Sequence, residues 1–129
     1  MAWTIPGFTF TRVAGADLSS SQYYYVKLST TDTVVACAAA TDVPIGILQN
    51  APASGAEATI MVTGISKVSS NAALAIGNLI GTSSDGQADA KTAGSDTTEY
   101  VVGVVLEASS GANALATATV NCLNPHRGA

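Results

Sequence analysis

One pattern occurs twice in this chain, and it limits the folds that the chain can adopt. Its first copy, at 43–62, reads VPIGILQNAPASGAEATIMV: an apolar run, a segment rich in turn residues, and a second apolar run. A similar sequence follows at about 100–120. The apolar runs are short and contain β-branched residues, which is typical of buried strands. The repeat therefore predicts two similar β-hairpin units.

Single glycines allow the two copies to be aligned. Gly46 is matched with Gly103, a separation of 103 − 46 = 57, and Gly55 with Gly111, a separation of 111 − 55 = 56. Two copies are too few for a solenoid, which needs about three or more repeats. We therefore expect both hairpin units to lie within one compact β domain.

Short strands separated by turn residues continue through the rest of the chain. Further strands are expected at 22–28, 33–38, 63–68, 77–81 and 115–123. This spacing predicts an all-β fold, a compact β-barrel or sandwich of short antiparallel strands. Ser83–Gly86 is a hairpin signal, and the polar segment Ala88–Thr98 is predicted to be a mobile loop. Only Asn71–Ile76 fits a helix, of one or two turns.

The first 22 residues differ from the rest of the chain. Six of the seven aromatic residues lie among residues 1–25, and two of them alternate with threonines after the break at Pro6-Gly7. Either the rings fill the core, with Tyr24 inside, or they form an extended arm that binds a partner, with Trp3 outside. We divide the chain into an arm with a first strand at 1–22 and a single β domain at 23–129. The candidate contact residues are Trp3, Pro6, Phe8, Phe10 and Tyr23.

Low charge excludes several classes of partner. Charged residues are 11% of the chain and the net charge is −4, so the five Lys and Arg residues cannot form a track for nucleic acid. No apolar run approaches the roughly 18 residues of a membrane span. The N-terminus also lacks the basic and hydrophobic parts of a signal peptide. We therefore expect neither nucleic acid nor a membrane as partner. A surface poor in charge suits a protein that packs against other proteins.

The sequence offers few groups for catalysis. Its single histidine, His126, lies in a tail next to a proline. Asp85 and Asp89 lack the ligand spacing of a calcium loop, and Asp96 and Glu99 have no base nearby. Motifs of metalloproteases, serine hydrolases and nucleotide-binding proteins do not occur. We expect no enzyme activity, no cofactor and no metal.

The two cysteines do not form a redox or metal-binding motif. Cys37 and Cys122 are far apart in the sequence and lack the spacing of either kind of site. In a reducing cytoplasm we predict that both are free, buried thiols.

Three segments of the chain resemble a known family. These are PIGILQNAPASGAEATIMVTGISKV, AIGNLIGTSSDGQA and YVVGVVLEASSGANALATATVNCLNP. Together they are similar to the small capsid cement, or decoration, proteins of tailed bacteriophages. The match covers about 22–125, and its most specific part is PIGILQNAP followed later by VVGVVLEA. Asn78 departs from the family pattern, where an Asp often follows the glycine.

This resemblance implies a β-rich, non-catalytic virion protein on the outer surface of an icosahedral head. It would be made in the host cytoplasm and form oligomers, commonly homotrimers, that span neighbouring major capsid proteins after the shell expands. No shared motif identifies the residues that touch the capsid. Other virion components stay open as alternatives, namely a head fibre, a tail-tube subunit or a host-binding module. A small carbohydrate-active module that uses residues 85–99 is a further alternative.

Overall fold

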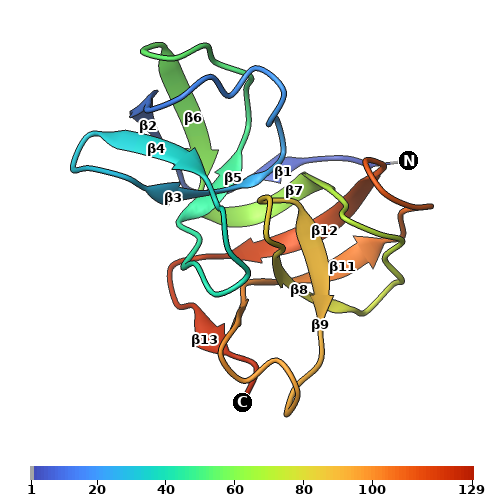
Figure 1. The fold of residues 1–129 in the computed structure, drawn as a ribbon. Coiled ribbons are helices and arrows are strands. Elements are labelled where there is room, and N and C mark those ends of the chain that lie inside the picture. The colour runs from blue at the N-terminus through green and yellow to red at the C-terminus, as the bar shows by residue number, and fades with distance from the viewer. Residues whose placement is uncertain (1) are drawn as a thin grey trace.

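The computed structural model describes residues 2–129 and confirms the all-β prediction. The strands are β1 (Ile5–Pro6), β2 (Thr9–Ala14), β3 (Tyr25–Leu28), β4 (Thr33–Ala36), β5 (Gly46–Leu48), β6 (Glu57–Met61), β7 (Thr63–Ser69), β8 (Leu79–Thr82), β9 (Ala88–Lys91), β10 (Tyr100–Val101), β11 (Gly103–Glu107), β12 (Leu115–Asn121) and β13 (His126–Arg127). They form a closed five-stranded barrel, a six-stranded sheet and the small β10–β13 ribbon (Figure 1). No helix occurs among the described residues.

The five-stranded barrel is formed by β2 to β6, which we call the first unit. Its strands follow the order β2-β4-β3-β5-β6, and β2 closes the ring because it pairs with β6 on one side and with β4 on the other. The β2–β4 pair is parallel, whereas the other pairs in the ring are antiparallel. The inward-facing side chains of these strands form one apolar core.

The six-stranded sheet contains a second unit, made of β7, β8, β9, β11 and β12. In the sheet order β1-β7-β12-β11-β8-β9, strands β7 and β9 stand far apart. The sheet nevertheless curls, because Ser70 and Ala88, next to the end of β7 and at the start of β9, form a parallel bridge. The second unit is therefore a barrel that one bridge closes.

The two units have the same topology. In chain order, β2 to β6 of the first unit correspond to β7, β8, β9, β11 and β12 of the second. In each unit the first strand is paired with the fifth, the fifth with the fourth, the fourth with the second, and the second with the third. The parallel bridge between Ser70 and Ala88 corresponds to the parallel pair Ala14–Val34 between β2 and β4. The repeat seen in the sequence at two hairpins thus extends over almost the whole chain.

Core positions of the two units correspond residue by residue. The buried core of the first unit consists of Ala14, Leu18, Val26, Val34, Leu48, Ala58 and Ile60. The equivalent buried positions of the second unit are Ser70, Leu74, Ile80, Ala88, Val105, Ala116 and Ala118. Matching strand registers support this alignment, since Val26 faces Gly46 and Ile80 faces Gly103.

One of the two glycine matches from the sequence is correct, and the other is displaced. At both Gly46 and Gly103 a Cβ would collide with a carbonyl oxygen of the neighbouring strand, which explains why both units have glycine there. Gly55, however, corresponds to Asn113 and not to Gly111. Each of these two residues has positive φ and donates its amide to an equivalent carbonyl, at 2.9 and 2.8 Å. A register shift in β11, between Val105 and Glu107, changes the offset between equivalent residues of the two units after that point.

A shared core joins the two units. Tyr25, Cys37, Ile47 and Met61 of the first unit belong to one buried cluster with residues of the second. Their partners in that cluster include Val68, Val102, Val120 and Cys122. We call this contact the seam. The sequence favours Tyr24 as the buried tyrosine, but the structure buries Tyr25 and leaves Tyr24 half-buried.

For the N-terminal segment the sequence left open a first strand or an extended arm, and the structure places residues 5–6 and 9–14 in paired strands. Strand β1 pairs with β7 through Ile5 and Pro6, and β2 pairs with β6 from Thr9 to Val13. Residues 5–14 therefore contribute to both units. The alternation of aromatic and threonine residues suits a strand, and the edge of β6 offers the backbone partners that this strand needs.

Two further local predictions are wrong. Asn71–Ile76 is irregular and contains no helix, and Leu74 within it makes a bridge with Ser109 and packs in the core. Six residues are too few to sustain a helix against such pairing. The segment Ala88–Thr98 is not wholly a loop, because Ala88–Lys91 is β9.

Candidate binding surfaces

Exposed apolar residues gather in the N-terminal segment. Trp3, Ile5 and Phe8 are 38%, 56% and 70% exposed, and Pro6 between them is also exposed. We call these four residues the N-terminal strip. Its backbone is held in place, since Trp3 donates its amide to Thr117 Oγ1 at 2.9 Å. Strand β1 also forms one edge of the six-stranded sheet. An apolar strip on a sheet edge is a surface that suits a protein partner.

The five predicted contact residues do not lie together. Trp3, Pro6 and Phe8 belong to the strip, whereas Phe10 is partly buried against the core of the first unit. The Arg12 guanidinium lies 5.0 Å from the centroid of the Phe10 ring. Tyr23 lies elsewhere, in a pocket between the two units. Sequence reasoning missed Ile5, although its two-residue spacing from Trp3 is the period of a strand face.

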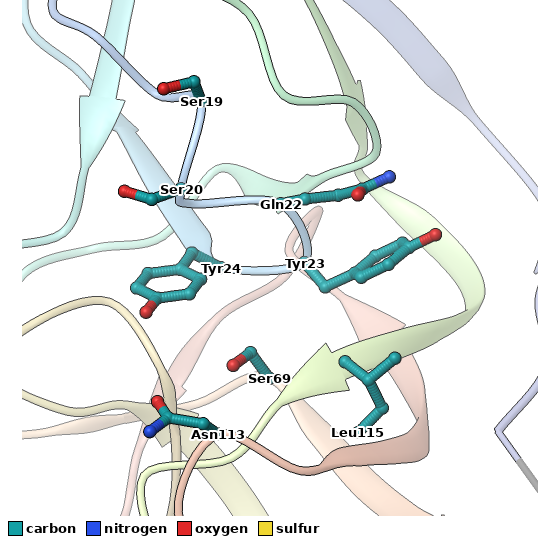
Figure 2. Close-up of a pocket in the computed structure, with 8 residues that line it drawn as sticks. All are labelled: Ser19, Ser20, Gln22, Tyr23, Tyr24, Ser69, Asn113 and Leu115. Atoms are coloured by element: carbon teal, nitrogen blue, oxygen red, sulfur yellow. The ribbon is translucent and has the colours of Figure 1, made fainter.

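A pocket of about 400 Å³ opens between the two units, within the roughly 300–1,000 Å³ of small-molecule sites. It is lined by Ser19, Ser20, Gln22, Tyr23, Tyr24, Ser69, Asn113 and Leu115. Figure 2 shows the rings of Tyr23 and Tyr24 turned toward opposite ends of the pocket, across from Ser69, Asn113 and Leu115. None of the lining side chains carries a formal charge. We call this cavity the tyrosine pocket.

A buried glutamine holds the polar wall of the tyrosine pocket. Gln87 Nε2 donates to Ser69 Oγ at 2.9 Å and to Asn113 Oδ1 at 2.8 Å. Gln87 is itself fixed, because its backbone amide donates to Asp85 Oδ1 at 3.1 Å. Since Asn113 Oδ1 already accepts this hydrogen bond, the Asn113 amide nitrogen stays available as a donor. On the other wall, burial and then nearby Asp85 raise the pKa of Tyr24, so its phenol stays protonated.

A buried lysine ties the loop after β9 to the second unit. The Lys91 side chain is 1% exposed, and its Nζ donates to Thr82 O at 2.8 Å and to Glu99 Oε1. Asp89 Oδ2 lies 3.8 Å from the same nitrogen. Glu99, which was considered as a catalytic acid, and Asp89, which was considered as a calcium ligand, thus compensate a buried charge.

The remaining candidate groups also have structural partners. Asp96 Oδ2 accepts a hydrogen bond from the Thr92 amide at 2.6 Å. His126 is exposed on β13, where it pairs with Val101 of β10. Within residues 2–129 no three His, Cys, Asp or Glu side chains are grouped so that they could hold a metal ion. Over the same residues no helix has the length and apolarity to cross a membrane.

Both cysteines lie in the seam, and the prediction that they are free and buried is confirmed. Burial raises the pKa of Cys37 and of Cys122 from the ordinary 9.0 to about 12. The thiols therefore remain protonated at neutral pH. Burial also raises the pKa of Tyr25 well above its usual range, and the Tyr25 hydroxyl has no hydrogen-bond partner among the described residues.

The fold is found in a known phage protein. No family model and no curated protein sequence matches the chain. Among solved structures, the chain is similar to the N base of the head fibre protein gp8.5 of bacteriophage phi29, with a TM-score of 0.67. The match covers 89% of this chain and 94% of that chain, at 18% sequence identity. At this level of identity the likeness concerns the fold.

Proposed function

We propose that this chain is a structural protein of a bacteriophage virion, which binds the outside of an icosahedral head and joins neighbouring major capsid proteins. The observation that carries the proposal is the fold shared with the base of a phage head fibre over nearly the full length of both chains. The motifs similar to capsid cement proteins point in the same direction. The proposed role is non-catalytic.

In this proposal the N-terminal strip supplies the contact with the capsid. Phe8 and Ile5 expose apolar surface that water solvates poorly, and burial against a capsid protein would stabilise the complex. Strand β1 also has one unpaired edge, to which a neighbouring chain could add a strand. Since the strip carries no charge, binding should depend only weakly on salt.

Binding to the expanded shell would stabilise that shell in the way a ligand stabilises the state it recognises. At a free concentration of 100 times the dissociation constant, the stabilisation is about 2.7 kcal/mol per site. A homotrimer would strengthen the effect, because linked subunits rebind at a high effective concentration.

A head-fibre base is the second candidate, and the structural likeness favours it specifically. The two roles differ in what they require of the head. A cement protein occupies sites throughout the lattice and protects the shell, whereas a fibre base only anchors a projection. Both roles use an outer surface of the capsid.

The test adds the purified protein to heads assembled without it. Occupancy is measured by cryo-electron microscopy, and head survival is measured on heating at low and high salt. The cement role predicts filled lattice sites and higher survival temperatures at both salt concentrations. Bound protein without any gain in survival would support the fibre role. Absence of binding to heads would contradict both.

A matched pair of variants tests the contact surface. Phe8→Ser should weaken head binding about tenfold or more, because a buried aromatic anchor at an interface contributes on that scale. Leu123→Ser changes a residue that is 64% exposed but lies outside the N-terminal strip, and it should leave binding unchanged. Equal binding by both variants would rule out the strip as the contact.

A further inference from the structure

Two non-glycine residues with positive φ lie in the same pocket. Tyr23 and Asn113, with φ of 67° and 66°, are the non-glycine residues of positive φ within residues 2–129. Both line the tyrosine pocket, although they come from different units of the chain. Asn tolerates this conformation, but for a bulky residue such as Tyr it is unusual and costly. Strain of this kind gathers at functional sites.

The internal repeat provides a control for this strain. Tyr23 donates its amide to Leu48 O, and at the equivalent position Gly77 donates to Val105 O, both at 2.8 Å. Asn113 corresponds in the same way to Gly55. At both positions the other unit therefore has a glycine, with φ of 86° at Gly77 and 84° at Gly55.

These glycines identify what the backbone requires by itself. Beside Gly77 and Gly55 a Cβ would meet no atom within 4 Å, so crowding does not explain the choice of glycine. The left-handed conformation does explain it. Where the two units meet, Tyr23 and Asn113 stand at the positions that have glycine in the other unit, and the side chains of both line the pocket. Their side chains therefore account for their presence: the Tyr23 ring packs against the seam, the Asn113 side chain accepts a hydrogen bond from Gln87, and both also line the pocket.

The chemistry of the pocket favours a neutral, hydroxyl-rich ligand. Two aromatic rings offer flat apolar faces, while serine hydroxyls and side-chain amides offer both donors and acceptors. Lys67 Nζ lies 5.6 Å from the centroid of the Tyr23 ring and helps to hold it in place. Gln87 orients the Asn113 amide. A sugar presents apolar C–H faces and hydroxyl edges that match these groups.

We propose that the tyrosine pocket binds a short, neutral saccharide, by stacking on Tyr23 and Tyr24 and by hydrogen bonds to Asn113 and Ser69. The rings at opposite ends of the pocket suit a ligand longer than one sugar ring (Figure 2). This inference goes beyond the capsid role and does not depend on it.

The first experiment screens the full-length protein against neutral oligosaccharides of glucose, galactose and N-acetylglucosamine. Sialylated and sulfated oligosaccharides and a proline-rich peptide are included as competing ligands. Binding is followed by NMR chemical shifts. The proposal expects a neutral saccharide to move the resonances of Tyr23, Tyr24 and Asn113. It is overturned if no neutral saccharide moves them at 10 mM in this assay, roughly the weak end of specific binding, or if the peptide or the charged forms bind more tightly.

The second experiment uses the repeat to separate binding from folding. Tyr23→Gly restores the residue type of the equivalent Gly77. It relieves the positive φ but removes a ring that packs against the seam, so the variant should fold with a melting temperature close to that of the unchanged chain. It should lose at least tenfold in affinity for the saccharide found in the screen. Asn113→Gly, which copies the equivalent Gly55, should show the same combination. Leu123→Ser removes an exposed apolar side chain outside the pocket and should bind the saccharide as the unchanged protein does.

The same variants can contradict the proposal. If Tyr23→Gly lowers the melting temperature and leaves saccharide affinity unchanged, Tyr23 has a structural role only. Because the test compares affinity with stability in each variant, a folding defect cannot be mistaken for a binding defect. Head binding is not used as a readout, so failure of the capsid role would leave this result unaffected.

Discussion

The two units share one topology but fill their interiors with different residues. The seven-residue core of the first unit is wholly apolar. At the equivalent positions the second unit has smaller side chains at Ala88, Val105 and Ala118, in place of Val34, Leu48 and Ile60. It also has the polar Ser70 in place of Ala14. The buried polar residues of residues 2–129 are Ser66, Ser69, Ser70, Thr82, Ser83, Gln87, Lys91, Ser109 and Thr117. All of them lie in or beside the second unit.

Polar pairs accompany the smaller core of the second unit. Ser70 Oγ donates to Ser109 Oγ at 2.7 Å, and Ser109 Oγ accepts the Leu74 amide at 3.1 Å. Buried polar groups are costly unless they are paired, and these are paired. Closure differs as well, since β2 seals the first barrel while one bridge closes the second. The comparison shows that strand order does not require a particular core chemistry.

Of the changes that test how the two units differ, removal of β2 should have the largest effect on stability. A chain that begins at Gly15 lacks the strand that closes the first unit, and it exposes the core around Val26 and Ile60. Because the seam couples the units, we expect loss of the cooperative thermal transition in circular dichroism. A chain that begins at Gly7 keeps β2 and is the control, with a melting temperature close to that of the full chain. If the Gly15 chain still melts cooperatively at the original temperature, the second unit folds alone.

The sequence predicted the fold class and the two hairpins, because short apolar runs and the turn residues between them are local signals. It missed the full repeat, since equivalent positions share strand register more often than identity. Cys37 and Lys91 are both buried but chemically unlike, and at Arg12 and Val68 even the burial differs. The shift caused by the β11 bulge also misplaced the glycine match. A single irregular residue changes the register of everything that follows.

The candidate sites were less accessible to sequence reasoning. The clustering of aromatic residues drew attention to the N-terminal strip, where the structure leaves Trp3 and Phe8 exposed, but it also included Phe10 and Tyr23, which lie elsewhere. The tyrosine pocket was not, because Tyr23 and Asn113 come from distant parts of the chain and meet only in the folded molecule. Their positive φ angles leave no clear signal in a single sequence, although alignment of the two units would have placed each opposite a glycine.

Substitutions at one pair of equivalent core positions should show whether each core is fully packed. Ile60 is fully buried in the first unit, so Ile60→Ala should lower the free energy of unfolding by about 2–5 kcal/mol. Its equivalent, Ala118, already has the smaller side chain, and Ala118→Ile should cost about 1–3 kcal/mol by overpacking. Urea denaturation measures both. A stabilising Ala118→Ile would show that the second core is underpacked instead of complete.

The buried lysine offers a test of the polar interior. Glu99→Gln removes the carboxylate that compensates Lys91, and we expect a loss of about 2 kcal/mol. This is below the roughly 3–5 kcal/mol for a fully buried pair, because Glu99 is 23% exposed. Lys91→Met makes the position neutral, like the equivalent Cys37, and should cost less. A larger loss for Lys91→Met than for Glu99→Gln, in the same urea assay, would mean that the charge itself stabilises the second unit.

The smallest expected effect concerns the seam, where Cys37 comes from the first unit and Cys122 from the second. Both thiols have a folded pKa of about 12, above the ordinary 9.0 that applies when the chain unfolds. Below pH 9 each thiol is protonated in both states, so its full contribution to stability is present. As pH rises above 9, the unfolded thiol releases its proton while the folded one keeps it. The native state then binds more protons, and stability falls until about pH 12.

At pH 10 this loss is about 1 kcal/mol for each thiol. The measurement is the difference between the free energies of unfolding at pH 8 and pH 10, for the unchanged chain and for Cys37→Ala and Cys122→Ala. Each variant should recover about 1 kcal/mol of the difference between the two pH values. The cavity cost of the substitution cancels because it is present at both pH values. Equal recovery is expected if the seam opens only when both units unfold together. A recovery seen for one cysteine alone would show that its unit opens first, and that the shared core does not unite the two barrels.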